Sequence, residues 1–211
     1  MDRVFVKFIK QIIWQRGYLV AHSQITDDET TLIEQAQQGD RNAFGELVCS
    51  YYPGVVRVVY RLCGDTGLAE DMAQEAFLRG WVNLPSFHPQ SSLRNWLYRI
   101  AVNATLDVLR RRSEDTLEDE AAQMYPDQAD GPETTLIKKE RVALLQQVIR
   151  SLPEAARSVL VLREYGGLSY QEIAGVLDVP VGTVMSRLNY ARNRLREQLK
   201  DQLQELENEY A

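Results

Sequence analysis

Residues 168–196, LSYQEIAGVLDVPVGTVMSRLNYARNRLR, have the pattern of two helices joined by a tight turn. Ser169, followed three residues later by Glu172, is the signature of a capping box at the start of the first helix. Pro180 then interrupts the helical pattern, because proline lacks an N–H group and disfavours helix at the preceding residue. Apolar residues recur at helical spacing from about Gly182, which predicts a second helix.

The second helix is predicted to have one apolar face and one polar face. Its apolar stripe is Val184, Leu188, Ala191, Leu195 and Leu199, and its polar face is Ser186, Asn189, Tyr190 and Asn193, flanked by Arg187, Arg192, Arg194 and Arg196. Short polar side chains can reach base edges in the DNA major groove, while arginines bind phosphates. We interpret residues 168–196 as a DNA-binding helix-turn-helix. The charge pattern alone would favour an ordinary solvated helix.

The net charge of −6 at first argues against a nucleic-acid binder. Residues 113–137, however, carry eight acidic residues and no basic residue. The rest of the 211-residue chain has 22 acidic and 24 basic residues, so it is slightly basic. We interpret residues 113–137 as a flexible acidic linker between two helical units.

The cysteines and histidines do not form a recognisable site. Cys49 and Cys63 lie in apolar helical patterns, which predicts buried free thiols in reducing, cytoplasmic surroundings. The sequence lacks paired carboxylates, metal-spaced His/Cys sets, a Ser/His/Asp arrangement and a P-loop. We therefore expect no catalytic residues, no metal and no cofactor, and an enzyme acting on nucleic acid is a weak alternative.

Residues 1–26 mix apolar residues with lysines and arginines. No unbroken apolar run approaches the roughly 18–20 residues of a membrane-spanning helix, and no signal-peptide cleavage site is clear. An amphipathic helix that touches a membrane or a partner is one interpretation. We prefer a loosely ordered extension, or an upstream start codon wrongly chosen.

The pattern from residue 28 to residue 112 is helical throughout. We expect a helix over 31–38 and a second one capped by Asp40, bent at Pro53–Gly54 and closed by Gly64. A third helix over 68–81 is opened by Asp65–Gly67. One side of this third helix carries Asp71, Gln74, Glu75 and Leu78. By itself this side is typical of a solvated face, although carboxylates around an exposed leucine could also meet a basic partner.

A loop from Asn83 to Ser92 precedes a long helix that is predicted to end at Arg112. Ser91 or Ser92 can cap this helix. The loop contains Phe87 and His88, and the side chains expected off the core stripe of the helix are Asn95, Trp96, Arg99 and Asn103. Aromatic, guanidinium and amide groups together suit single-stranded DNA, because unpaired bases stack on planar groups or enter polar pockets.

Three stretches together resemble the extracytoplasmic-function (ECF) group of bacterial sigma factors, within the sigma-70 family. They are DMAQEAF (71–77), WLYRIAVN (96–103), and LSYQEIA (168–174) with PVGTVMSRL (180–188). The resemblance covers about residues 29–112 and 138–203. It implies an all-α fold with two small helical domains joined by the acidic linker. The implied division is an N-terminal extension (1–26), a region 2 domain (27–112), the linker (113–137), a region 4 domain (138–203) and a tail (204–211).

The resemblance also implies roles for single residues. The residues expected to dock on the β′ clamp helices of RNA polymerase are Asp71, Gln74, Glu75 and Leu78. The residues expected to open and read the −10 promoter element are Phe87, His88, Ser92, Asn95, Trp96, Arg99 and Asn103. The residues expected to contact the −35 element are Thr183, Met185, Ser186, Arg187, Asn189, Tyr190 and Arg192.

The implied partners are core RNA polymerase, through its β′ clamp helices and β subunit, together with promoter DNA and an anti-sigma factor. No small-molecule substrate is expected. The protein would act in the cytoplasm, where an anti-sigma factor can hold it at the membrane. The linker is long enough for this function: 25 residues reach roughly 80 Å, while promoter elements about 17 base pairs apart are separated by roughly 58 Å. The alternative is a stand-alone helix-turn-helix regulator that does not bind polymerase.

Overall fold

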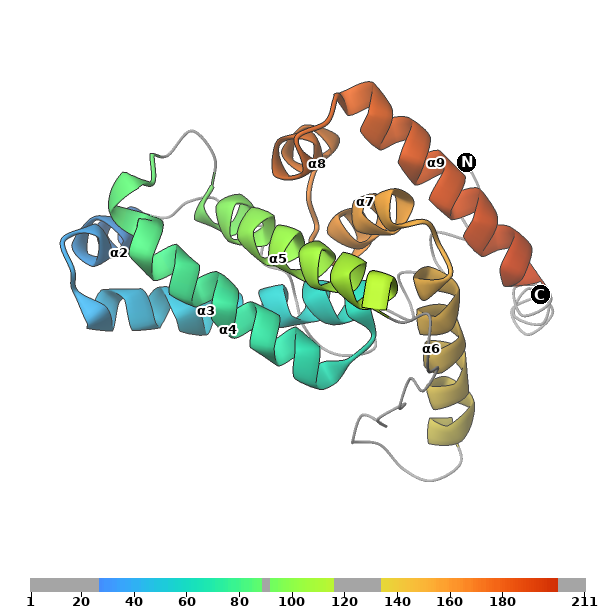
Figure 1. Cartoon of the computed structure of the whole chain (residues 1–211). Coiled ribbons are helices and arrows are strands. Elements are labelled where there is room, and N and C mark those ends of the chain that lie inside the picture. Colours follow the sequence, from blue (N-terminus) through green and yellow to red (C-terminus); the bar gives the residue numbers. More distant parts are fainter. Residues whose placement is uncertain (1–26, 89–91, 116–133, 201–211) are drawn as a thin grey trace.

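The computed structural model describes residues 27–88, 92–115 and 134–200, and all regular structure within these ranges is helical. The expected all-α class is therefore confirmed. The first unit contains α2 (Asp27–Gln37), α3 (Arg41–Cys63), α4 (Thr66–Asn83), the short 3₁₀ helix η1 (Leu84–Ser86) and α5 (Leu93–Asp115). The second unit contains α6 (Thr134–Arg150), α7 (Glu154–Glu164), α8 (Tyr170–Leu177) and α9 (Val181–Gln198). Figure 1 shows the two units in contact, with α8 beside the beginning of α5.

The helix boundaries of the first unit follow its capping residues. The Asp40 side chain accepts hydrogen bonds from the amides of Asn42 and Ala43, and the Asp65 side chain accepts one from the amide of Leu68. Gly64 ends α3 in the left-handed region at φ 73°, which is the common way for a helix to stop at glycine. These caps agree with the sequence prediction.

Pro53–Gly54 does not divide the chain into two helices, because α3 continues through Pro53. Proline leaves the carbonyl four residues earlier, that of Cys49, without its helical partner. Both Pro53 and Cys49 are exposed, so water can bind this carbonyl. Leu47 and Val58, on either side of the proline, are buried in the same core, so both halves of α3 pack against the rest of the unit.

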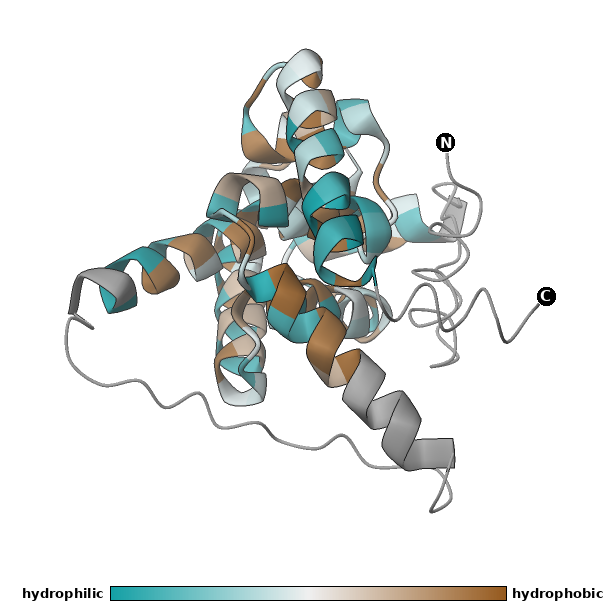
Figure 2. Ribbon diagram, turned by 90° about the vertical axis from the view of Figure 1, so that its right-hand side faces the viewer, coloured by the Kyte–Doolittle hydropathy of each residue, from teal (hydrophilic) through white to brown (hydrophobic). Residues whose placement is uncertain are grey.

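The core of the first unit lies where α3, α4 and α5 pack together. Its buried side chains include Leu47, Leu62, Phe77, Leu84 and Leu97. Figure 2 shows apolar and polar segments alternating along the helices, as expected where each helix buries one face. Cys63 is buried as predicted, but Cys49 is exposed, because it lies on the outer side of α3; both are free thiols.

The second unit packs α7 against α8 and α9. Every member of the predicted apolar stripe of α9 is buried: Val184, Leu188, Ala191, Leu195 and Leu199. Pro153 stands before α7 and Pro180 before α9, where a missing N–H costs nothing. The local pattern therefore predicted the order of these helices correctly.

The two units share one continuous set of buried residues, which joins α3 and α5 to α6, α7 and α8. Helix α5 extends to Asp115 and α6 begins at Thr134, within the range 113–137 that the sequence analysis gave to the linker. Residues 116–133, and the predictions made for residues 1–26 and the tail, lie outside the described residues. Within the described ranges, no helix is both long and apolar enough to cross a membrane.

Candidate nucleic-acid interface

The helix-turn-helix is fixed by hydrogen bonds within a few residues of the turn. The Ser169 side chain accepts from the Glu172 amide (3.2 Å), and the Glu172 carboxylate accepts from the Ser169 amide (2.7 Å), so the predicted capping box is complete. Asp178 ends α8 in the left-handed region at φ 53°, a conformation that aspartate tolerates better than most residues. This geometry directs the chain from α8 into α9.

Helix α9 presents its polar face to solvent. Ser186, Asn189 and Asn193 are exposed, and the side chains of Met185 and Tyr190 are 54% and 46% exposed. Thr183 and Arg187 are half-buried at the edge of this face. The face can offer hydroxyl and amide groups for hydrogen bonds, and apolar surface for thymine methyl groups.

Arg192 is held by an ion pair within the second unit, because its guanidinium lies 2.8 Å from the Glu164 carboxylate. The other two arginines near the end of α9 contact neighbouring side chains, Arg194 with Glu197 (3.0 Å) and Arg196 with Asn193 (3.1 Å). Only the ion pair of Arg192 is largely removed from solvent. Arg192 therefore has a structural partner that the sequence pattern did not indicate.

Helix α5 places Trp96 beside a hollow of about 380 Å³ on the first unit. The hollow is lined by Arg79, Asn83, Ser86, Trp96, Ile100 and Asn103. Among the predicted residues it brings together Trp96 and Asn103, while Arg99 and His88 are exposed elsewhere on the surface. The hollow combines an aromatic ring, a guanidinium and amides, which is the set of groups that can receive an unpaired base.

Arg79, Asn83 and Ser86 were missed by the sequence analysis. Arg79 and Asn83 are four residues apart on α4, and the Asn83 amide donates to the Arg79 carbonyl (2.8 Å). The available signal was the extension of the helical pattern from 81 to 83, which places both residues on one side of the helix. The Arg79 guanidinium is also paired with Glu75 at 2.6 Å.

Phe87 is positioned differently from the prediction. Its side chain is 5% exposed, and its ring packs against Trp96 with 5.1 Å between ring centroids. Helix α2 holds the loop in place, because the Gln37 amide donates to the carbonyls of Leu84 (3.1 Å) and Phe87 (2.8 Å). In this structure Phe87 supports the ring of Trp96 and does not offer its own face to a base.

Asn95 was expected off the core stripe of α5, with its side chain available to DNA, but it is 7% exposed. Its amide donates to Glu172 of α8 (3.0 Å), and the neighbouring Arg94 donates to the same oxygen (3.3 Å). Ser92 caps α5 as predicted, accepting from the amide of Asn95 (3.3 Å). The second unit therefore covers one of the residues predicted to read DNA.

The predicted docking face on α4 is open to solvent. Asp71 and Gln74 are exposed, Glu75 is half-buried, and Leu78 is 64% exposed. Val82, four residues after Leu78, is 74% exposed and was not predicted as part of this face. Two large apolar side chains in water, next to acidic and amide groups, are typical of a surface that binds another protein.

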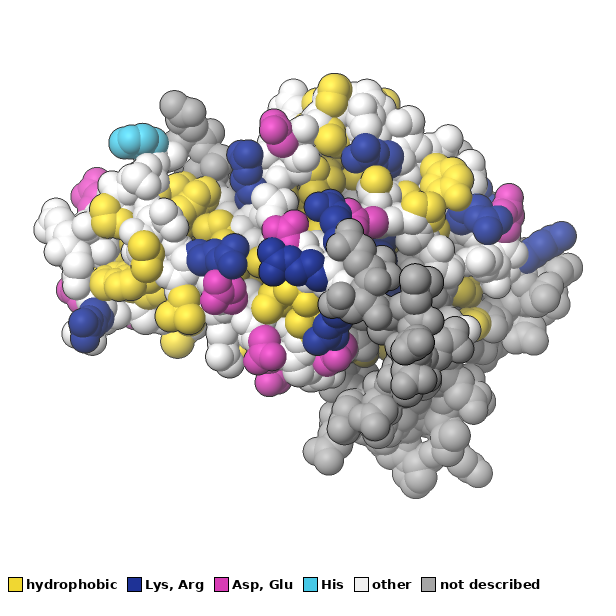
Figure 3. Space-filling view, viewed as in Figure 1, with side chains coloured by type: hydrophobic (Ala, Val, Ile, Leu, Met, Phe, Trp, Pro, Cys, Tyr) yellow, Lys and Arg dark blue, Asp and Glu magenta, His cyan; other side chains and the backbone are white. Residues whose placement is uncertain are grey.

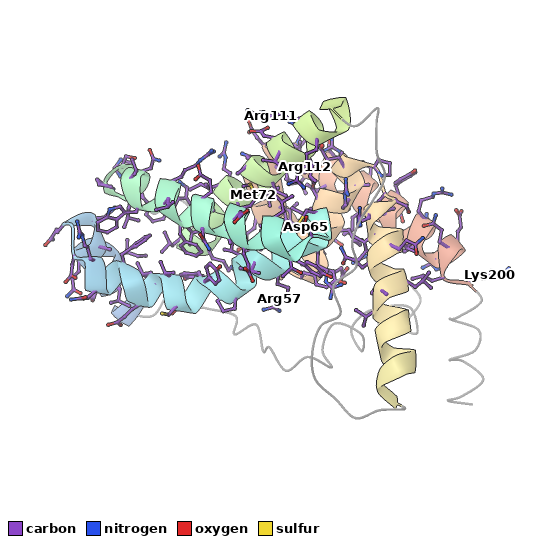
Figure 4. The ribbon with its side chains drawn as sticks, turned by 60° about the horizontal axis from the view of Figure 1, so that its bottom comes forward. Arg57, Asp65, Met72, Arg111, Arg112 and Lys200 are labelled. Atoms are coloured by element: carbon purple, nitrogen blue, oxygen red, sulfur yellow. The ribbon has the colours of Figure 1, made fainter. Side chains whose placement is uncertain are left out.

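Basic side chains gather along the face shown in Figure 3, over α5 in the middle of the view and toward α9. The arginines of α5 are Arg94, Arg99, Arg110, Arg111 and Arg112. Arg112 lies 3.9 Å from Asp65, the cap of α4 (Figure 4). The described residues contain no cluster of His, Cys, Asp or Glu that could hold a metal ion.

Comparison with known proteins identifies both units. The family model described as sigma-70 region 2 matches residues 47–114, and the model described as sigma-70 region 4 matches residues 143–195. The ECF RNA polymerase sigma factor SigW of Bacillus subtilis is 40% identical over 178 residues, covering 80% of this chain and 95% of SigW. The ECF RNA polymerase sigma-E factor of Escherichia coli is 37% identical over 181 residues, covering 82% of this chain and 93% of that protein.

Solved structures give the same result. The structure of CnrH in complex with the cytosolic domain of CnrY matches with a TM-score of 0.64 and 26% identity, covering 83% of this chain and 99% of CnrH. The sigma factor RpoE of Bartonella quintana, solved with the anti-sigma factor NepR, matches with a TM-score of 0.62 and 25% identity, covering 74% of this chain and 96% of that chain. A stand-alone helix-turn-helix regulator would leave the region 2 match unexplained. The chain therefore belongs to the ECF sigma factors of the sigma-70 family, which direct RNA polymerase to promoters and are not enzymes.

Proposed function

We propose that three surfaces of this chain have separate roles in promoter recognition. The exposed face of α4 would dock on the β′ clamp helices of core RNA polymerase. The α5 side, with the hollow beside Trp96, would capture bases of the opened −10 element, and the polar face of α9 would contact the −35 element, with further contacts to the β subunit. The observation that carries the proposal is that α9 buries its whole apolar stripe while its polar face remains in water.

The assignment of the hollow beside Trp96 rests on its chemistry. Arg79 and Asn103 border it, so a base that stacks on Trp96 could also find hydrogen-bond donors and acceptors. Phe87 would act through Trp96 by holding its ring in place. Asn95, Ser92 and Arg99 would join the site once the second unit moves away from α5.

An anti-sigma factor is proposed as the regulator. The similar sigma factor RpoE of Bartonella quintana has been solved with the anti-sigma factor NepR, and the similar protein CnrH with the cytosolic domain of CnrY. A partner of this kind would compete with polymerase or DNA for the surfaces described above. In the cell it would hold this chain away from core polymerase until a signal releases it.

The docking assignment is tested by reversing the charge of the α4 face. Gln74→Lys together with Glu75→Lys places two cations where a basic partner would need acidic and amide groups, so retention by immobilised core polymerase should fall at least tenfold. Glu34→Lys with Gln38→Lys, two exposed positions at α2, is the matched control and should bind polymerase normally. Circular dichroism checks that both variants fold. Normal retention of the α4 variant would remove the docking assignment.

A further inference from the structure

The last turn of α7 contacts both helices of the helix-turn-helix. The Arg163 guanidinium donates to the carbonyl of Leu168 (2.6 Å) in the turn before α8, and it lies 5.1 Å from the centre of the ring of Tyr170, the first residue of α8. The next residue, Glu164, pairs with Arg192 of α9 (2.8 Å). Two consecutive side chains at the end of α7 therefore hold the start of α8 and the second half of α9, and Figure 1 shows α7 beside α9.

The backbone around Glu164 gives this pair a firm base. The amide of Gly166 donates to the Val161 carbonyl (3.1 Å), and the amide of Leu168 donates to the Leu162 carbonyl (3.2 Å), which closes the turn into α8. The Leu168 side chain is buried in the core. Glu164 lies between these hydrogen-bonded residues, so its carboxylate has a fixed starting point from which to hold α9.

Arg192 lies at the border between the buried stripe of α9 and its polar face. It follows Leu188 by four residues and precedes Leu195 by three, and both leucines are buried. It also follows the exposed Met185 by seven residues, or about two turns, so these side chains share one side of the helix. A contact at Arg192 therefore influences the direction in which the exposed side chains of α9 point.

The pair of Glu164 with Arg192 is sheltered from water. The two side chains are 17% and 20% exposed, whereas those of Glu197 and Arg194, which pair nearer the end of α9, are 66% and 48% exposed. Attraction between opposite charges strengthens where water is excluded, while most exposed pairs contribute little. If Arg192 turned toward a phosphate, the Glu164 carboxylate would lose this cation in a sheltered position, which is unfavourable. We therefore expect the pair to persist when α9 meets DNA.

We propose that Arg192 is a positioning residue and not a DNA contact, and that its pair with Glu164 fixes the rotation of α9 so that Ser186 and Asn189 point at the −35 element. This role rests on the proposed function, because it concerns how the polar face of α9 meets DNA, whereas the pair itself does not. The arginine that the family resemblance assigns to DNA thus acts inside the protein. Substitutions in the pair should change discrimination between −35 sequences and not the number of phosphates contacted.

The first test removes the charge of Glu164 and keeps its shape. Holoenzyme with Glu164→Gln is compared with wild-type holoenzyme for binding to a promoter fragment selected by the wild type, and to the same fragment with its −35 element scrambled. The ratio of the two affinities should fall about fivefold or more, the effect of losing one good base contact. If Arg192 contacted a phosphate, removal of the Glu164 charge would free the guanidinium, so both affinities would rise and the ratio would stay the same. That result, or an unchanged ratio with unchanged affinities, would overturn the proposal.

The second test exchanges the two charges. Arg192→Glu alone places two carboxylates against each other and should lower the ratio, whereas Arg192→Glu combined with Glu164→Arg restores an attraction and should bring the ratio back to within about threefold of the wild type. The slope of log affinity against log salt should match the wild type in the exchanged chain, because no phosphate contact is lost. No recovery, together with a slope reduced by about one, would show that Arg192 meets DNA. Glu164→Gln decides the question if the exchanged chain does not fold.

Two control variants separate orientation from stability. Glu197→Gln removes the exposed pair with Arg194 (3.0 Å) from the same helix and should leave the ratio unchanged. Ile149→Val shortens a buried side chain of α6, so it should lower the melting temperature and also leave the ratio unchanged. An equal fall of the ratio in Ile149→Val would show that lost stability is sufficient, which overturns the positioning role.

Failure of the proposed function gives a different result. A wild-type holoenzyme that binds the intact and scrambled fragments equally would overturn the role of α9 at the −35 element. The pair is then tested without DNA, by urea unfolding of Glu164→Gln, Arg192→Met and the double variant. The unfolding equilibrium constant of the double variant should change about threefold less than the product of the two single changes. Independent effects of the two substitutions would overturn the pair.

Discussion

The carboxylate of Glu172 stabilises both the start of α8 and the contact between α8 and α5. It completes the capping box of α8 and accepts from Asn95 and Arg94 of the other unit. Burial alone would raise the pKa of Glu172, but the hydrogen bonds from Asn95 and Ser169 and the charge of Arg94 lower it from 4.5 to about 2. Glu172 is therefore ionised at neutral pH, and its charge is available to hold α5.

Tyr165 carries a hydroxyl that is buried without a partner among the described residues, while its ring lies 4.7 Å from the Arg61 guanidinium. Tyr165→Phe removes the hydroxyl and keeps the ring, so the free energy of unfolding should rise by about 1 kcal/mol. Tyr51→Phe is the control, because Tyr51 donates to Glu29, and it should lower that free energy by about 1 kcal/mol. Urea denaturation measures both. Equal losses in the two variants would show that the Tyr165 hydroxyl has a partner.

Helix α8 is short, with only eight residues, and its stability depends on its ends and on its packing. The capping box satisfies its beginning, and Asp178 turns the chain at its end. Gly175 lies inside this helix and borders the groove between the units. A glycine inside a helix lowers its stability, so α8 is a weak element at the place where the two units meet.

Replacing glycine by alanine at two positions with different backbone conformations should change the free energy of unfolding in opposite directions. At Gly175 an added Cβ would meet nothing within 4 Å, so Gly175→Ala should raise the free energy of unfolding by about 0.5–1 kcal/mol. At Gly64 φ is 73° and the Cβ would lie 2.6 Å from Arg150 Cδ, so Gly64→Ala should lower it by about 1–2 kcal/mol. Thermal and urea denaturation of the two variants checks both signs. Stabilisation at Gly64 would contradict the left-handed cap assigned to α3.

Helix α9 should bind DNA partly through charge. Arg187 lies at the edge of its polar face, where a guanidinium could contact a phosphate. Arg187→Ala should weaken promoter binding by the holoenzyme and reduce the slope of log affinity against log salt by about one. Arg41→Ala, an exposed arginine at the start of α3, serves as the control and should leave the slope unchanged. An unchanged slope for Arg187→Ala would remove the phosphate contact.

The two units form a single packed body in this structure, although the sequence predicts two units joined by a linker. A continuous set of buried residues joins them. Polar contacts between the described residues of the two units include Asn95 with Glu172, Arg157 with the Leu62 carbonyl, and Arg110 with Glu154 (2.6 Å). This arrangement leaves the polar face of α9 and the proposed docking face of α4 in water while it covers Asn95. The faces of one chain therefore differ in what they can bind before any partner arrives.

The contact between the units should weaken in acid. Glu172 has a pKa of about 2 in the folded protein against 4.5 for the free group, so its stabilising effect is complete above pH 4.5. That effect is lost as the pH falls from 4.5 toward 2, because the carboxylate then binds a proton. The difference in free energy of unfolding between the wild-type chain and Glu172→Gln should therefore be largest near neutral pH and shrink at pH 3. A difference that grows on acidification would contradict the assigned pKa.

Much of the fold follows from short-range physical chemistry, which the sequence records directly. Helix starts at Asp40, Asp65 and Ser169 come from side chains that bind amides two or three residues away. The polar and apolar faces of α9 follow from helical periodicity, and both are placed as predicted. Local patterns therefore determined the helices, their order and the side of α9 that meets solvent.

Only the tertiary structure decided which side chains are accessible. Asn95 is covered by a residue 77 positions away in the sequence, Phe87 is buried under the Trp96 ring, and Cys49 is exposed although its surroundings in sequence are apolar. Continuity of α3 through Pro53 likewise depends on packing of both halves in one core. Helical periodicity tells which residues share a face. The element that packs against that face depends on contacts between distant segments, and a local sequence pattern does not determine the free energies of those contacts.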